Sequence, residues 1–227
     1  MLNMRYKYRI KFIKYGRMRF IGHLDLANVF RRVLNRAKIP MAYSQGFNPH
    51  QEISFALPLS LGYYSNGEYM DIICVNPIDT KAVCESLNTF MPEGVNVLVT
   101  KEFNQGEKSS AALVKAASYS ISIPDDLVLT NELISTFMAQ NTIEILKKSK
   151  NNEQITDIKP DIINISIDDN NILKVTLSAG PESSLRADAL VKALYDFNTV
   201  ELNPLKVKYV REDLLKEENG KLVPIIG

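Results

Sequence analysis

Cysteine and tryptophan are scarce in this chain of 227 residues, which has no tryptophan and two cysteines, Cys74 and Cys84. Two cysteines are too few for a disulfide framework or an iron–sulfur cluster, so we expect both to be buried thiols. No run of about 18 apolar residues is present, which argues against a transmembrane helix. The first residues lack the apolar stretch of a signal peptide. These absences predict a cytoplasmic protein with no membrane partner.

Motifs of nucleotide and metal chemistry are also missing. The sequence contains no glycine loop that cradles phosphate, no dinucleotide-binding fingerprint and no Gly-x-Ser-x-Gly elbow. Its two histidines, His23 and His50, could join Asp25 at a metal ion, but the paired or helix-spaced ligands typical of zinc sites are absent. We therefore expect no metal and no cofactor.

Charge is distributed very unevenly along the chain. The first fifty residues hold eleven Lys or Arg and a single acid, Asp25, whereas the remainder holds 16 bases and 25 acids. A net charge of +1 is thus divided into a basic segment and an acidic remainder. Such asymmetry predicts a polyanionic partner for the basic segment. Nucleic acid is the obvious candidate, because neutralising phosphates releases counterions and drives binding.

Hydrophobic periodicity in the first half predicts the order β-α-β-β-α-β. We expect strands at residues 6–14, 53–57, 68–75 and 95–101, and helices at residues 24–38 and 81–90. This is the order of the split βαβ, or ferredoxin-like, unit, in which both helices cover one face of the sheet. Alternation in the first strand places Lys7, Arg9 and Lys11 on the open face, the face that RNA-binding modules of this architecture use.

The second half repeats this pattern more loosely, with one extra strand. We expect strands at residues 119–123, 142–148, 162–167, 172–177 and 205–210, helices at residues 131–139 and 185–197, and an exposed loop at residues 149–153. The predicted fold class is α+β, built from two tandem ferredoxin-like halves. The predicted domains are residues 1–103, which form the basic half, and residues 117–227, joined by a linker at residues 104–116.

The candidate RNA-binding residues lie in the basic segment. The loop Tyr43–His50 is dense in polar and aromatic groups, which can read base edges or stack on bases. The alternative is a structured turn that Gly46 and Pro49 require. The full candidate set is Lys7, Arg9, Lys11, Arg17, Arg19, Arg31, Arg32, Arg36, Tyr43, Gln45, Phe47, Asn48 and His50.

His23 is the first candidate for catalysis, because it lies between the first predicted strand and the first predicted helix. There it could act as general base on a ribose hydroxyl, or bind phosphate when protonated. His50 or Tyr15 would be the second acid–base group. The alternative is a histidine that caps or packs, since one imidazole is weak evidence for catalysis.

Four stretches carry a resemblance to a known family: Gly16–Leu26, Ala42–His50, Ser54–Leu59 and Gly67–Asp71. They resemble the bacterial radical-SAM-linked proteins, a domain of unknown function that occurs alone or fused behind a radical SAM enzyme. The resemblance is specific over residues 5–100 and looser in the second half. The chain lacks the Cys-x-x-x-Cys-x-x-Cys motif of the enzyme. The resemblance therefore implies an accessory protein with a radical SAM partner.

A second likeness is architectural. Tandem ferredoxin-like halves with a histidine after the first strand are similar to the CRISPR repeat-processing endoribonucleases. The glycine-rich loop expected near the C-terminus of those enzymes is missing here, and Asn219–Lys221 is a poor substitute. Proteins of one fold host many functions, so this likeness implies an architecture rather than an activity.

These observations give three hypotheses. The preferred one is a non-catalytic RNA-binding accessory protein that presents tRNA or rRNA to a radical SAM modification enzyme. The second is a metal-independent RNA-processing enzyme that uses His23. The third is a protein-interaction module, in which the basic face docks the radical SAM partner or is quenched by the chain's own acidic half.

Overall fold

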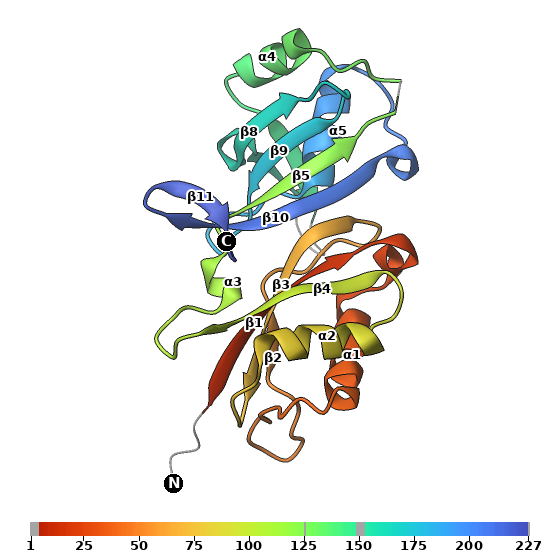
Figure 1. The fold of residues 1–227 in the computed structure, drawn as a ribbon. Helices are drawn as coiled ribbons and strands as arrows, with labels where there is room; N and C mark the ends of the chain where they lie inside the picture. Colours follow the sequence, from red (N-terminus) through yellow and green to blue (C-terminus); the bar gives the residue numbers. More distant parts are fainter. Residues whose placement is uncertain (1–4, 125, 149–152, 227) are drawn as a thin grey trace. The chain divides into compact units, whose positions relative to one another are not determined.

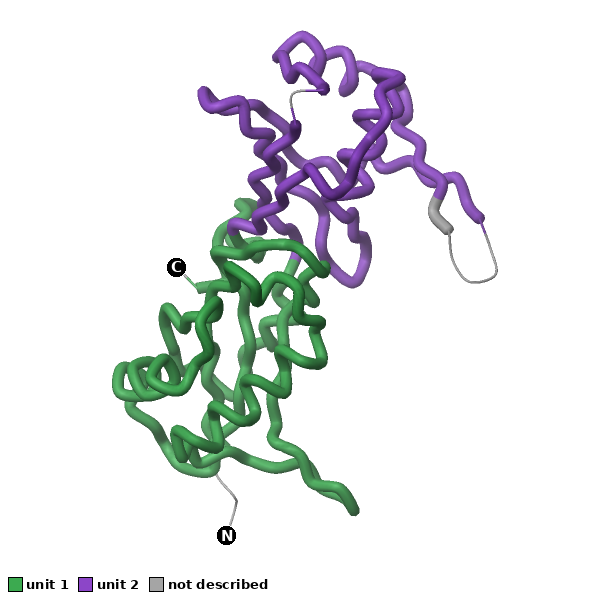
Figure 2. The backbone as a smooth tube through the Cα atoms, turned by 90° about the vertical axis from the view of Figure 1, so that its right-hand side faces the viewer, with its two compact units in different colours: residues 1–114, 213–227 green, residues 115–212 purple. Residues whose placement is uncertain are grey.

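The structure, a computed structural model, describes residues 5–124, 126–148 and 153–226. It divides into two compact units (Figure 2). Unit 1 comprises Met1–Val114 together with Asp213–Gly227, and unit 2 comprises Lys115–Glu212. The last fifteen residues therefore pack with the first half of the chain. The sequence-based division had placed these residues in the second domain.

Unit 1 follows the predicted order of strands and helices closely (Figure 1). Its first part contains β1 (Tyr6–Lys14), the 3-10 helix η1 (Gly16–Phe20), α1 (His23–Arg36), β2 (Ile53–Phe55), β3 (Tyr64–Cys74), α2 (Thr80–Phe90), β4 (Val95–Phe103) and α3 (Ser110–Leu113). The C-terminal hairpin pairs the end of β10 (Lys208–Glu218) with β11 (Lys221–Pro224). β10 begins in unit 2 and ends in unit 1.

Strand pairing in unit 1 is antiparallel, with β1 between β4 and β3 and with β2 on β3. Tyr8, Ile10 and Phe12 of β1 are fully buried among apolar side chains of α1 and α2. The intervening residues, among them Lys7 and Arg9, face the other side of the sheet, because successive side chains of a strand alternate. The core of unit 1 thus lies between the sheet and its two longer helices.

The connection between β1 and α1 is fixed by Gly94, in the turn before β4. The Tyr15 amide donates to the Gly94 carbonyl oxygen at 2.8 Å. Gly94 has a φ of +96°, and a Cβ atom there would lie 2.6 Å from Cγ of Met18 and 2.7 Å from the carbonyl oxygen of Tyr15. Only glycine fits both this conformation and this contact. The turn therefore holds η1 against the sheet, just ahead of α1.

Unit 2 is also a mixture of strands and helices. It contains β5 (Ala116–Ser122), α4 (Asn131–Ala139), β6 (Glu144–Lys148), β7 (Glu153–Asp157), η2 (Lys159–Asp161), β8 (Ile162–Ile167), β9 (Leu173–Ser178), α5 (Ala187–Phe197) and η3 (Pro204–Lys206). β9 pairs antiparallel with β5 and β8, and β6 pairs with β7. Of the predicted loop at residues 149–153, residues 149–152 lie outside the described residues, and Glu153 begins β7.

The fold class is therefore mixed α+β, with mostly antiparallel pairing in each unit. Of the segment predicted as a linker, residues 104–116, the part up to Val114 belongs to unit 1 and includes the short helix α3, whereas Ala116 already begins β5 of unit 2. The Ser110 amide donates to Oδ2 of Asp71 on β3 at 2.6 Å. The charged residues from Asp213 onward continue β10 and form a hairpin with β11.

Candidate nucleic-acid interface

Arg9, which the alternation places on the open face of the sheet, lies in a buried ion pair. It is directly opposite Asp71 in the pairing of β1 with β3. Its Nε and Nη2 atoms donate to Oδ1 and Oδ2 of Asp71 at 2.8 and 3.2 Å. Nη2 also donates to the Lys108 carbonyl oxygen at 3.0 Å. The two side chains are 6% and 8% exposed, so the charge of Arg9 is compensated within unit 1.

Lys11 is compensated by the returning C-terminal strand. Its Nζ atom lies 2.6 Å from Oδ2 of Asp213, and Oδ1 of Asp213 accepts a 2.5 Å hydrogen bond from the Tyr69 hydroxyl. Burial, and then this hydrogen bond, raise the pKa of Tyr69 well above its ordinary value. Lys7 differs: its Nζ donates to the Gln105 carbonyl oxygen at 3.0 Å, and within the described ranges it has no carboxylate partner.

The outward face of α1 carries cations that are not compensated. Arg32 and Arg36 are exposed, as is Lys38 just past the end of the helix. Arg31 is half-buried, and its Nη1 donates to the Asn28 side-chain oxygen at 3.0 Å. Among residues 5–124, 126–148 and 153–226, none of these four cations forms an ion pair. We call this group the α1 face.

Two further arginines of the candidate set precede α1 on η1. Arg17 is exposed. Arg19 is sandwiched between aromatic rings, with its guanidinium carbon 4.3 Å from the centroid of Phe20 and 4.7 Å from that of Tyr64. The Gly62 amide donates to the Arg19 carbonyl oxygen at 2.8 Å, and this hydrogen bond holds the segment before β3 against η1. Phe20 remains 59% exposed, so the stack presents an aromatic surface to solvent.

The loop Tyr43–His50 is closed by its own polar groups. The Ser44 amide donates to the His50 carbonyl oxygen at 2.9 Å, and the Ser44 hydroxyl lies 2.9 Å from Nδ1 of His50. Beyond this closure its side chains point outward: Phe47 is fully exposed and Tyr43 is about half exposed, at 48%. Gln45 and Asn48 are exposed as well. The turn is structured, as the second interpretation expected, and its tip presents aromatic and polar groups to solvent.

A side-chain hydrogen bond connects Gln51, the residue after this loop, to α1. Nε2 of Gln51, a buried residue, donates to Oδ1 of Asn35 on α1 at 2.8 Å. Asn35 lies between Arg32 and Arg36 in the sequence and is itself exposed. Exposed cations of α1 and a structured loop with exposed rings are therefore neighbours in unit 1.

The two histidines have different environments. His23 begins α1, and its ring packs edge-on against Phe55 with 5.1 Å between ring centroids. Phe55 packs in turn against Phe12 and Phe30, so His23 lies on the helix-covered side of the sheet. In the part of the chain that the structure describes, its imidazole makes no hydrogen bond or ion pair. Tyr15, its predicted partner in catalysis, is 43% exposed.

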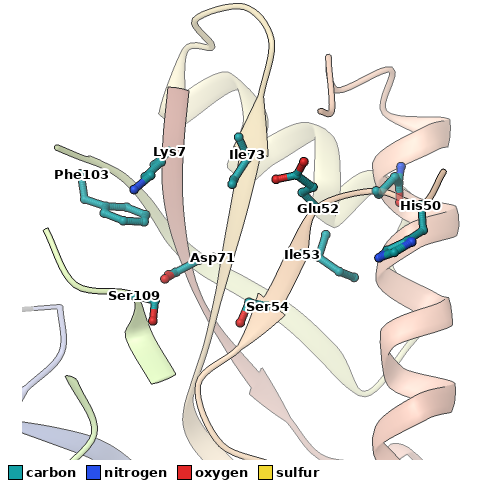
Figure 3. A pocket seen from close by; sticks show the side chains of 10 residues that line it. Lys7, His50, Glu52, Ile53, Ser54, Asp71, Ile73, Phe103 and Ser109 are labelled. Atoms are coloured by element: carbon teal, nitrogen blue, oxygen red, sulfur yellow. The ribbon is translucent and has the colours of Figure 1, made fainter. Parts of the chain in front are cut away.

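His50 lines a pocket of about 340 Å³ on the face of the sheet opposite the helices (Figure 3). Lys7 and Phe103 stand on one side of this pocket, and Glu52 and His50 on the other, with Ile73 between them. The pocket lies entirely within unit 1. The structure thus brings together two residues of the candidate set, Lys7 and His50, that the sequence places far apart.

Both thiols of the chain have raised pKa values because of burial. Cys74 is fully buried, and burial raises its pKa to about 12. Cys84 is half-buried with a raised pKa, again because of burial. Among the described residues, no group of His, Cys, Asp and Glu side chains is arranged to hold a metal ion. No described helix has the length and apolar character needed to cross a membrane.

Sequence reasoning missed three residues of this region: the two acids that pair with cations of β1, Asp71 and Asp213, and the aromatic Phe103. Asp71 had a signal, since its alternation in the predicted third strand placed it beside Tyr69 and Ile73 and away from the core. Asp213 had none, because it is 202 residues from Lys11 and lies in a charged segment. Phe103, which lies just past the predicted end of the fourth strand, extends β4 and lines the pocket.

Comparison with known proteins identifies the family of the chain. A family model described as "Uncharacterized protein conserved in bacteria (DUF2344)" matches residues 7–187. No curated protein matches the chain. The crystal structure of an unknown protein from Galdieria sulphuraria aligns over 92% of this chain and 98% of its own, with 10% identity and a TM-score of 0.30. Similarity at that level carries no argument.

Proposed function

The chain belongs to this uncharacterized bacterial family, and we propose that it is a non-catalytic RNA-binding accessory protein whose α1 face contacts the phosphates. The observation that supports the proposal is the group of uncompensated cations on α1. Arg32, Arg36 and Lys38 are exposed and have no described ion pair. Such cations release counterions when they meet a phosphate backbone, and this release drives binding that weakens as salt rises.

Within this proposal the members of the candidate set have different roles. Arg9 and Lys11 are held by Asp71 and Asp213, so we assign them to the stability of unit 1. Arg17, Arg31, Arg32 and Arg36 remain phosphate contacts, and Lys38 joins them. The charge carried by this surface therefore comes mainly from the helix rather than from the open face of the sheet.

The neighbouring loop supplies contacts to bases. Phe47 and Tyr43 are exposed rings on a closed turn, and aromatic rings stack on unpaired bases in a sequence-tolerant way. Gln45 and Asn48 offer amide groups to base edges at the same tip. RNA is preferred over duplex DNA as the ligand, since single-stranded loops leave bases free to stack.

The proposed fold of each unit, the partner, the kind of RNA and the cellular location rest on the sequence pattern and on the family resemblance. We interpret each unit as a ferredoxin-like half, an interpretation supported in unit 1 by the order β-α-β-β-α-β and by β1 lying between β3 and β4. A radical SAM enzyme as partner, tRNA or rRNA as the ligand and a cytoplasmic location rest on the sequence alone. The alternative of RNA cleavage by His23 requires turnover by the purified protein without a cofactor.

A second candidate function is docking of a partner protein. It is favoured by exposed apolar side chains around η1, since Phe20, Leu24 and Leu61 are 59%, 76% and 64% exposed. Clustered exposed apolar groups mark interaction surfaces on many proteins. This function predicts that Leu24→Ser weakens capture of a protein partner while RNA binding is unchanged.

The test of RNA binding compares two variants with the same change in charge. The first replaces Arg32, Arg36 and Lys38 with Gln; the second replaces the exposed Lys115, Lys192 and Lys206 of unit 2 with Gln. Fluorescence anisotropy with labelled cellular RNA at low salt should show a large loss of affinity for the first variant and little loss for the second. Equal losses would mean that net charge alone drives binding. An unchanged affinity of the first variant would refute the α1 face.

A further inference from the structure

The pocket on the open face of unit 1 has a charge balance that specifies its ligand. Two of its three charged residues are carboxylates with partners: Asp71 pairs with Arg9, and Glu52 pairs with Arg5. The third, Lys7, has no carboxylate partner among the described residues, since its Nζ donates only to a carbonyl oxygen. The pocket therefore carries one uncompensated positive charge, which suits a ligand group with a single negative charge.

The walls of the pocket suit a planar ring. Phe103, Ile53 and Ile73 supply apolar surface (Figure 3). Phe103 is half-buried and stands beside Lys7, whose Nζ is 5.8 Å from the ring centroid. A volume of about 340 Å³ lies within the range of roughly 300–1,000 Å³ that is usual for small-molecule sites. An aromatic or heterocyclic ring can thus enter next to a cation.

Polar groups at the rim can orient such a ring. Nδ1 of His50 is engaged by the Ser44 hydroxyl at 2.9 Å, which leaves Nε2 of the same imidazole for a ligand. Ser54, on the exposed side of β2, adds a hydroxyl group. A planar ring with hydrogen-bonding edges, joined to a group of charge −1, is the description of a nucleotide within an RNA strand.

We propose that this pocket binds a single unpaired nucleotide, with its base against Phe103 and its phosphodiester near Lys7. The proposal rests on the proposed function, because the nucleotide is part of the RNA held by the α1 face. A free nucleoside monophosphate offers the same ring beside a phosphate, with close to two negative charges on its phosphomonoester at neutral pH, and is the second source that the experiment distinguishes. In either case the open face of the sheet contributes one pocket, in place of the broad basic surface that the sequence predicted.

The test measures how much of the affinity depends on a base next to Phe103. Short single-stranded RNA and an abasic strand of the same length are titrated against the wild type, Phe103→Leu and Phe90→Leu. Leucine keeps an apolar side chain but removes the ring, and Phe90, at the exposed end of α2, is the matched control. Phe103→Leu should lower RNA affinity by about 5- to 150-fold, the range for loss of one stacked base, and leave abasic affinity unchanged.

Unchanged RNA affinity in Phe103→Leu would overturn the proposal that the pocket binds a nucleotide. If that variant still binds RNA in a salt-sensitive way through the α1 face, the proposed function is unaffected. If Phe103→Leu fails to fold by circular dichroism, Lys7→Gln is used instead. It should reduce the slope of log affinity against log salt by about 0.7, the value for one phosphate contact to a single strand. An unaltered slope would overturn the proposal in the same way.

The nucleoside 5′-monophosphates form the last arm of the test. Binding that matches the affinity of RNA, and that is lost in Phe103→Leu but kept in the α1-face variant, would identify a free nucleotide as the ligand. That result would support the pocket and refute its link with RNA. If neither RNA nor any monophosphate binds the wild type, both the pocket and the proposed function are overturned.

Discussion

Removing Asp71 should cost unit 1 far more stability than the loss of a surface charge. Arg9 and Asp71 are 6% and 8% exposed and share two hydrogen bonds of 2.8 and 3.2 Å. Asp71→Asn keeps the shape of the side chain but leaves the Arg9 guanidinium buried without a counter-charge. Breaking a buried pair in this way costs about 3–5 kcal/mol. The Ser110 amide also loses its charged acceptor, which should loosen the start of α3.

Urea denaturation followed by circular dichroism measures the free energy of unfolding, and hydrogen exchange at the Ser110 amide reports on the local loosening. Glu218→Gln is the control, because Glu218 pairs with Lys216 at 3.5 Å and is 57% exposed. Exposed pairs contribute about 0–1 kcal/mol. Replacing both partners, with Arg9→Met and Asp71→Leu, should restore the part of the stability lost to the unpaired charge, while the Ser110 amide still lacks its acceptor. A loss below about 1 kcal/mol for Asp71→Asn would refute the buried pair.

Three further predictions concern backbone strain, pH and thiol reactivity. Gly94→Ala should destabilise unit 1 by more than about 1 kcal/mol, whereas Gly62→Ala, at a φ of +85° with nothing within 4 Å, should cost less, as thermal unfolding would show. Burial is the main reason that the pKa values of Tyr69 and Tyr195 are raised. The contribution of these protonated tyrosines to the free energy of unfolding is therefore complete below about pH 10 and is lost at higher pH. Denaturation at a series of alkaline pH values should show that decline. Because burial raises the pKa of Cys74 to about 12, this thiol should resist alkylation at neutral pH until the protein unfolds, as mass spectrometry would show.

Local sequence patterns predicted the elements of unit 1 well. The alternation of 6–14 matches β1, and the apolar stripe of α1 buries Leu26, Phe30 and Leu34. The predicted end of that helix at residue 38 was too late, because Lys38 adopts a φ of +53°. No glycine or asparagine marks that position, so the pattern held no signal for the left-handed residue that terminates the helix.

Long-range pairing was what the sequence did not reveal. The predicted last strand, residues 205–210, begins near β10 but misses its continuation through Asp213 to Glu218. That continuation is stabilised by contacts made far away in the sequence, with Lys11 and Tyr69. Because the acidic partners of Arg9 and Lys11 are distant in the sequence, the sequence pattern predicted a free basic surface on β1. Charge pattern locates a basic face, but only tertiary contacts show which cations are compensated.

The central claim is that the cations of α1, rather than the ion-paired Arg9 and Lys11 of β1, form the main contacts to RNA phosphates. The most direct test is the salt dependence of RNA affinity between about 50 and about 200 mM for the wild type, the Arg32/Arg36/Lys38→Gln variant and the Arg9→Met, Asp71→Leu variant. Three lost phosphate contacts should reduce the slope of log affinity against log salt by about 2 in the first variant. The second variant changes Asp71 in the lining of the pocket but keeps Lys7, so its slope should equal that of the wild type. A reduced slope in the second variant and an unchanged one in the first would contradict the account.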